Sequence, residues 1–154
     1  MASEPRRPSA ELARLVGVWT GDGEVFANPW GPAGRTTGEW RFRLDGGGFN
    51  LIHDYREIRD GANVFEGHGV LTVDPETADW LWFWFDTYGF PPLAPARGGW
   101  EAGRLSLAKS TPRGQARSVF TLDGDALEYA VETRLADAAD FIPVSRGRYL
   151  RRAA

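Results

Sequence analysis

Two histidines are the first candidates for chemistry in this chain. The dipeptide Asp60-Gly61 is a strong turn signal and predicts a β-hairpin with one histidine on each arm. If the loop has two residues, His53 and His68 face each other directly, and opposed side chains lie ~5 Å apart on one face of a sheet. Such a pair could act as general acid and base. A one-residue shift in the pairing would separate the two imidazoles.

The next strand, expected over residues 80–86, would bring tryptophans and a carboxylate to this pair. A five-residue loop before it predicts that Trp84 lies beside His68 and that Asp86 lies beside Glu66. Asp86 ends an apolar run, where a carboxylate needs a partner such as His or Arg. A solvated strand end is the alternative interpretation of Asp86.

The same segment is apolar on both faces, which predicts burial on both sides. We expect Trp80 to be a packing residue, whereas Trp82 and Trp84 suit a core or a cavity wall equally well. Gly67 and Gly69, on either side of the second histidine, indicate either a β-bulge or space for a ligand.

These residues form one predicted site inside the protein. Its catalytic candidates are His53, His68 and Asp86, and acid–base chemistry could also use Tyr55. The predicted ligand-binding residues are Trp40, His53, Tyr55, His68, Trp82, Trp84 and Asp86.

Other site chemistries find less support. Two histidines and a carboxylate could hold zinc or iron, but no HxH or HExxH spacing occurs, and the chain has no cysteine. No GxSxG motif supports a serine nucleophile, and no helix follows the glycine clusters to bind a phosphate. We therefore predict no metal and no cofactor, with haem or a metal on His53 and His68 as an alternative.

Composition limits the possible partners. The 154 residues fit one domain, and an apolar share of 42% can fill its core. A net charge of −3 disfavours a nucleic-acid partner. No apolar run approaches the ~18 residues of a membrane span, and residues 1–15 lack the apolar core of a secretory signal. We expect a cytoplasmic protein that does not bind a membrane, and a homodimer is a possible assembly.

The elements that must position the site are almost all strands. We expect a tail over residues 1–8 and one domain over residues 9–152. That domain opens with a short helix near residues 9–15, in which Ser9 can serve as the N-cap and Leu12 and Leu15 share a face. Short β-type segments between turn signals follow, at 16–26, 37–44, 49–59, 63–73, 80–86, 96–101, 104–110, 115–123, 126–136 and 141–151.

Ten antiparallel strands in sequence leave two edges unpaired unless the sheet closes on itself. The sequence therefore predicts an all-β fold, a closed up-and-down barrel of about ten strands with a short N-terminal helix. A two-sheet sandwich is the alternative, and only the proline-rich loop at 87–95 is long enough for its crossover connections.

Several motifs together resemble a known bacterial family. The segment 15–24 is similar to the G-x-W-x-G-x-G start of calycin-like barrels of the nitrobindin and lipocalin type. More of the chain, from about residue 15 to 152, resembles the uncharacterised DUF1579 family. The matching segments are 54–55, 67–70, 74–75, 84–86, 91–92, 99–107 and 147–149.

The resemblance implies a ten-stranded calycin-type barrel and no particular activity. Nitrobindin-like proteins bind haem through a histidine near the C-terminus. This chain has no histidine after His68, so that ligand is missing and haem would need His53 or His68 instead.

Three functional hypotheses remain. The first is a binding module that holds a small, largely apolar or aromatic molecule in an internal cavity, with the loop at 87–95 and the helix near 9–15 as portal elements. The second is a cofactor-independent isomerase, cyclase or hydrolase that uses the same cavity. The third is a solid-cored barrel that binds another protein, or a second copy of itself, through its outer surface.

Overall fold

A computed structural model of the chain describes residues 7–153 and contains ten strands and two short helical segments. The tail predicted over residues 1–8 lies mostly outside the described residues. The helical segments are α1 (Ala10–Ala13) and η1 (Gly46–Gly48). The strands are β1 (Gly17–Val25), β2 (Gly34–Asp45), β3 (Asn50–Arg59), β4 (Ala62–Val73), β5 (Trp80–Asp86), β6 (Ala96–Glu101), β7 (Arg104–Thr111), β8 (Gly114–Asp123), β9 (Ala126–Leu135) and β10 (Ile142–Arg151).

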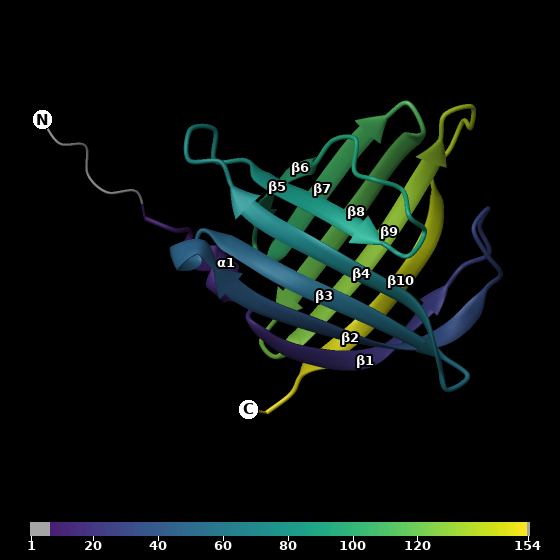
Figure 1. The fold of residues 1–154 in the computed structure, drawn as a ribbon, viewed down its shortest axis with the longest axis horizontal. Helices are drawn as coiled ribbons and strands as arrows, with labels where there is room; N and C mark the ends of the chain where they lie inside the picture. The colour runs from purple at the N-terminus through teal and green to yellow at the C-terminus, as the bar shows by residue number, and fades with distance from the viewer. Residues whose placement is uncertain (1–6, 154) are drawn as a thin grey trace, which may run out of the picture.

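The strands form a closed antiparallel barrel, which confirms the predicted fold class. Each strand pairs with its neighbours in sequence, and β1 also pairs with β10. The closing pair extends from Trp19 opposite Arg151 to Val25 opposite Ser145. In Figure 1, β3–β5 cross over β7–β10 at a steep angle, so two walls of the barrel face each other.

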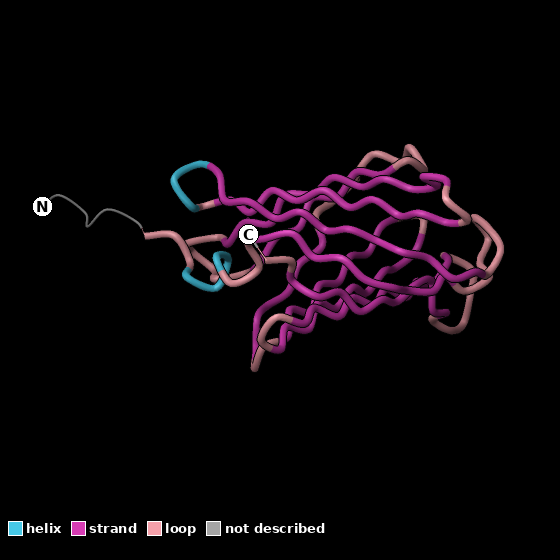
Figure 2. Tube along the Cα trace, turned by 90° about the horizontal axis from the view of Figure 1, so that it is seen from below, coloured by secondary structure: helices cyan, strands magenta, loops and turns pink. Residues whose placement is uncertain are grey.

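The two ends of the barrel differ. Figure 2 shows both helical segments at one end of the strands and loop-rich connections at the other. Leu12 and Leu15, from α1 and the turn that follows it, are fully buried, and Leu15 accepts a hydrogen bond at its carbonyl oxygen from Nε1 of Trp19. The helix thus packs against its end of the barrel, although Ser9, the predicted N-cap, makes no side-chain capping bond. The buried core includes Trp19, Phe42, Leu51, Leu71, Trp80, Leu105, Leu107, Phe120, Leu122 and Leu127.

An extra residue in β4 corrects the predicted pairing of the histidines. At the hairpin tip Arg59 pairs with Ala62, as the two-residue loop requires. The register then shifts, because Val64 has no partner on β3 and forms a β-bulge. Beyond the bulge His53 therefore pairs with Gly69, whereas His68 pairs with Asp54 and points to the outside of the barrel.

The pairing of β4 with β5 is also shifted by one residue from the prediction. The connection contains six residues rather than five, so Val73 pairs with Trp80 and Trp84 lies opposite Gly69. Asp86 consequently lies opposite Gly67 and not beside Glu66. The predicted proximity of Trp84 and His68 was wrong, because the two side chains lie on different faces.

Burial on both faces of β5 was a wrong prediction as well. Trp80 and Trp82 are buried on the inner face, and Trp84 is half-buried there. Phe83 and Phe85 lie on the outer face and are exposed. Strands of a closed antiparallel barrel have a single buried side, whatever the polarity of the residues opposite.

The glycines of β4 make room for aromatic rings inside the barrel. A methyl group at Gly69 would lie 2.8 Å from Nε1 of Trp82 and closer still to the His53 ring. A methyl group at Gly67 would overlap the ring of Trp84. These glycines were predicted to mark either a β-bulge or space for a ligand. The bulge lies at Val64 instead, and the space beside the glycines is filled by side chains of the protein.

We predict that Gly69→Ala destabilises the fold by about 3 kcal/mol, because the added methyl overpacks the His53–Trp82 contact. Gly99→Ala is the matched control, since no atom lies within 4 Å of the methyl group it adds. Urea unfolding of both variants measures the difference. Equal stabilities would show that the inner wall can yield at Gly69.

Candidate functional site

The half of the barrel away from α1 contains a cavity of about 660 Å³. Its walls come from opposite sides of the barrel, with β2–β5 facing β8–β10, and the loop at 87–95 borders its opening. Aromatic rings form much of the surface. They belong to Trp30, Trp40, Tyr55, Phe65, Trp82, Trp84, Tyr88, Phe90, Tyr129 and Tyr149.

Beside the cavity, β5 and β6 pair over only part of their length. Their pairing stops at Trp82 opposite Ala96, which leaves the last residues of β5 without a partner on that side. The loop at 87–95 occupies the vacated edge, and six of its residues (Tyr88 and 90–94) line the cavity. This loop was predicted as a portal element and lies at the opening, whereas α1 lies at the filled end.

Asp86 anchors this loop. Its Oδ2 accepts a hydrogen bond from Nε1 of Trp84 at 2.8 Å, and its Oδ1 accepts one from the backbone N–H of Tyr88 at 2.9 Å. The carboxylate thus finds indole and backbone donors instead of the expected His or Arg. Asp86 lines the cavity, and its bonds link the end of β5 to the start of the loop.

His53 is fully buried but does not line the cavity. Its Nε2 accepts a hydrogen bond from Nε1 of Trp82 at 2.8 Å, so the neutral ring carries its hydrogen on Nδ1. Nδ1 lies toward the Leu51 backbone without a hydrogen bond of normal geometry. The imidazole stacks between Phe42 and Trp84, with ring centroids 4.9 and 5.9 Å away.

His68 lies on the outer wall and is half-exposed. Its Nδ1 is 2.7 Å from Oδ1 of Asp54 on the neighbouring strand. Because the two imidazoles lie on opposite faces of the sheet, they cannot bind one metal ion or act as an acid–base pair. Neither of them faces the cavity, so the residues present do not fit a haem ligated by histidine inside the barrel. Within residues 7–153, no group of three or more His, Asp or Glu side chains is placed to hold a metal ion.

The cavity wall contains a polar cluster that the predicted site only partly included. Tyr55 donates a hydrogen bond from its hydroxyl to Oε1 of Glu57 at 3.1 Å, and the hydroxyls of Tyr55 and Tyr149 are 3.5 Å apart. Glu57 is only 8% exposed, and burial raises the pKa of its carboxyl group. Burial also raises the pKa values of Tyr55 and Tyr149. We call Tyr55, Glu57 and Tyr149 the phenol–carboxylate cluster.

Sequence reasoning selected Tyr55 but not Glu57, Tyr129, Lys109 or Tyr149. A signal for Glu57 exists, because it shares the inward parity of Leu51, His53 and Tyr55 along β3. Tyr149 carries no comparable signal. Its proximity to Tyr55 depends on β1 and β2, which separate the two strands in the barrel.

Lys109, the only lysine of the chain, also lines the cavity. Burial lowers the pKa of its amino group. It forms no ion pair within the part of the chain that the structure describes.

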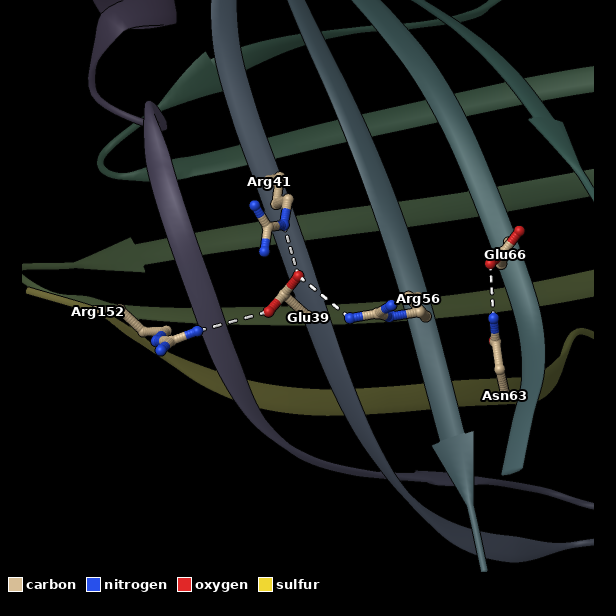
Figure 3. Close-up of polar contacts among 6 residues, drawn as sticks. All are labelled: Glu39, Arg41, Arg56, Asn63, Glu66 and Arg152. Carbon is tan, nitrogen blue, oxygen red and sulfur yellow. Dashed lines mark hydrogen bonds and ion pairs between the residues drawn. The ribbon is translucent and has the colours of Figure 1, made fainter. Parts of the chain in front are cut away.

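The outer wall has hollows of a different character. One, of about 1260 Å³, follows the outside of β1, β2 and β8–β10 and is lined by ion pairs such as Arg117 with Glu132 and Arg148 with Glu128. In Figure 3, three arginines on β2, β3 and beyond β10 surround Glu39. Charges there are compensated by neighbours, so the interior cavity is the better candidate site.

Comparisons with known proteins identify a family and a fold. A family described as "Protein of unknown function (DUF1579)" matches residues 4–138. The crystal structure of Rv2717c from M. tuberculosis has a TM-score of 0.74 at 16% identity, covering 96% of this chain and 100% of that one. A protein of unknown function from the DUF3598 family of Nostoc punctiforme has a TM-score of 0.46 at 16% identity, covering 99% of this chain and 53% of that one. No curated protein matches the sequence.

We predict that His53 makes the fold acid-sensitive. Burial lowers its pKa to about 3, against ~6.5 in the unfolded chain, so between these values only the unfolded state binds the proton. The contribution of neutral His53 to the free energy of unfolding is fully present above pH 6.5. It falls as the pH drops, and the loss reaches about 3 kcal/mol at pH 4.5. Urea unfolding from pH 7 to 4.5 should show a smaller loss in His53→Gln than in the wild type. His68→Gln, which removes an exposed imidazole, should retain the wild-type loss, and equal losses in all three proteins would contradict this origin.

Glu57 should have the opposite effect. Because burial raises the pKa of Glu57, the group stabilises the fold below its unfolded pKa, and this contribution disappears as the pH rises through the folded value. Glu57→Gln keeps an oxygen that accepts the Tyr55 hydrogen bond and removes the buried charge. We expect it to raise the unfolding free energy at pH 8 by about 1 kcal/mol and to gain less at pH 4. Loss of stability at pH 8 would show that the charge is compensated inside the barrel.

Proposed function

The chain belongs to the DUF1579 family, described as proteins of unknown function, and we propose that its barrel binds a small, largely apolar molecule in the interior cavity. The observation that carries this proposal is the division of the interior. One half is a filled core, whereas the other half contains an aromatic cavity bordered by the loop at 87–95.

The size and surface of the cavity support binding. Ligand pockets in proteins measure roughly 300–1,000 Å³ and are mostly apolar with a few placed polar groups. A volume of about 660 Å³ lies within this range. The phenol–carboxylate cluster and Lys109 supply the polar groups, on opposite sides of the barrel. Trp40, Tyr55, Trp82, Trp84 and Asp86, five of the residues selected from the sequence, line this cavity.

Rigid aromatic walls favour a preformed site. The ring of Trp40 stacks on Tyr55 at 4.4 Å and meets Tyr129 edge-on at 5.1 Å, so three strands contribute to one packed surface. A ligand that enters such a site orders few side chains, which reduces the entropic cost of binding. The flat walls also favour a molecule with a planar or aromatic body.

The proposal predicts a change in tryptophan fluorescence when apolar ligands bind, since Trp40, Trp82 and Trp84 all border the cavity. We expect native mass spectrometry of protein purified from its own host to detect a retained small molecule. A response to none of a broad panel of apolar compounds, with no retained molecule, would argue for a barrel that acts through its outer surface.

A blocking variant tests where the ligand binds. Ala116 lies on the cavity wall, so Ala116→Phe should lower affinity for any responding compound at least tenfold, a loss of about 1.4 kcal/mol. Ala130→Phe is the matched control, because Ala130 is exposed on the outside of the adjacent strand. Isothermal titration of both variants measures the affinities. Equal loss in both would place the binding site elsewhere.

A further inference from the structure

Glu57 is a buried carboxylate without a countercharge. One of its oxygens accepts the Tyr55 hydroxyl, and no cationic side chain among residues 7–153 lies within ion-pair distance of the other. Taking an ionised carboxylate out of water is costly unless it is paired. The side chain is more than nine-tenths buried and lines the cavity, so the space in front of it belongs to the ligand site.

None of the cationic side chains that line the cavity forms an ion pair with Glu57. Arg146 pairs with Glu24, Nε to Oε1 at 2.5 Å. Arg113 lies over the ring of Phe90 at 4.7 Å from its centroid. Lys109 lies on β7, and the carboxylate that attracts its amino group electrostatically is that of Asp86.

Arg59 is the cation whose field reaches Glu57, two residues away on the same strand. Its Nη1 donates instead to the carbonyl oxygen of Pro32 at 3.5 Å. The guanidinium therefore binds the loop between β1 and β2, and leaves the carboxylate unpaired.

A carboxylate on the outer wall provides a comparison, because its charge is compensated by neighbouring arginines. Glu39, which is 16% exposed, has guanidinium nitrogens of Arg41, Arg56 and Arg152 at 2.6, 3.8 and 3.7 Å (Figure 3). The chain has 17 arginines, yet none of those between residues 7 and 153 is placed beside Glu57 in this way. The contrast indicates that the compensating charge comes from outside the chain.

The rings around Glu57 suit a positive charge as well. Aromatic faces carry negative electrostatic potential and attract cations within about 6 Å, most strongly Trp and Tyr. Trp40 stacks on Tyr55, Tyr149 meets Trp40 edge-on at 6.4 Å, and all three line the cavity. Nε1 of Trp40, fully buried, lies toward the Tyr149 hydroxyl without a hydrogen bond of normal geometry.

We propose that the ligand of this cavity carries a weakly hydrated cationic nitrogen, a quaternary or tertiary ammonium group, on an apolar body. The ammonium group lies against Glu57 and the neighbouring ring faces, and the apolar body fills the aromatic part of the cavity. This inference rests on the proposed function and specifies its ligand class. A neutral ligand would leave the carboxylate buried and unpaired, which is why the cavity discriminates by charge.

Two compounds of nearly identical shape test the charge preference. Phenyltrimethylammonium carries the cationic nitrogen, and tert-butylbenzene has carbon in its place. We expect the cation to bind the wild-type protein at least tenfold more tightly in isothermal titration at pH 8. Glu57→Gln should reduce this preference at least tenfold by weakening the cation alone, while affinity for tert-butylbenzene stays within about twofold.

Asp54→Asn is the matched control, because it removes the same charge from the same strand on the outer wall. It should retain the wild-type preference. Tighter or equal binding of tert-butylbenzene by the wild type, or an equal loss of preference in both variants, would overturn the ammonium assignment and leave apolar binding intact. Failure of both compounds and of the wider apolar panel would overturn the proposed function together with this inference.

Discussion

The bulge at Val64 is the constraint on which the interior of this barrel depends. Side chains alternate between the two faces of a strand. One extra, unpaired residue therefore moves every later side chain of that strand to the face opposite the one that unbroken pairing would give it. In β4 it places Gly67 and Gly69 inside and His68 outside. Only glycine leaves room there for the rings that approach from β3 and β5.

Those rings divide the interior into two parts. His53, held by the Trp82 indole N–H and stacked between Phe42 and Trp84, is part of the layer between the leucine-rich end and the cavity. Its chemistry is therefore that of a buried hydrogen-bond acceptor whose protonation opposes folding. A single imidazole in this place joins three strands without exposing a charge to the core.

Charge is distributed unevenly between the two faces of the wall. Outside, carboxylates and guanidinium groups compensate one another, as around Glu39. Inside, Glu57 keeps only a phenol hydroxyl as its partner. A protein optimised for stability alone would replace such a group by a neutral one, so its presence is the kind of local cost that accompanies binding sites. The cavity, the unpaired carboxylate and the aromatic faces therefore support one interpretation, a site for an organic cation.

The sequence alone determined the strands and their closure. Turn residues at regular spacing and ten β-type segments without a second helical region leave few alternatives to a closed antiparallel barrel. Alternation along a single strand is also enough to assign Leu51, His53, Tyr55 and Glu57 to one face, as the burial pattern of β3 shows. The tertiary structure decided what the strands bring together. Register across a hairpin changes with one bulged or added loop residue, and local sequence does not encode it. The predicted pairing of His53 with His68 was therefore wrong. The contact of Tyr55 with Tyr149 depends on β1 and β2, which lie between their strands in the closed barrel.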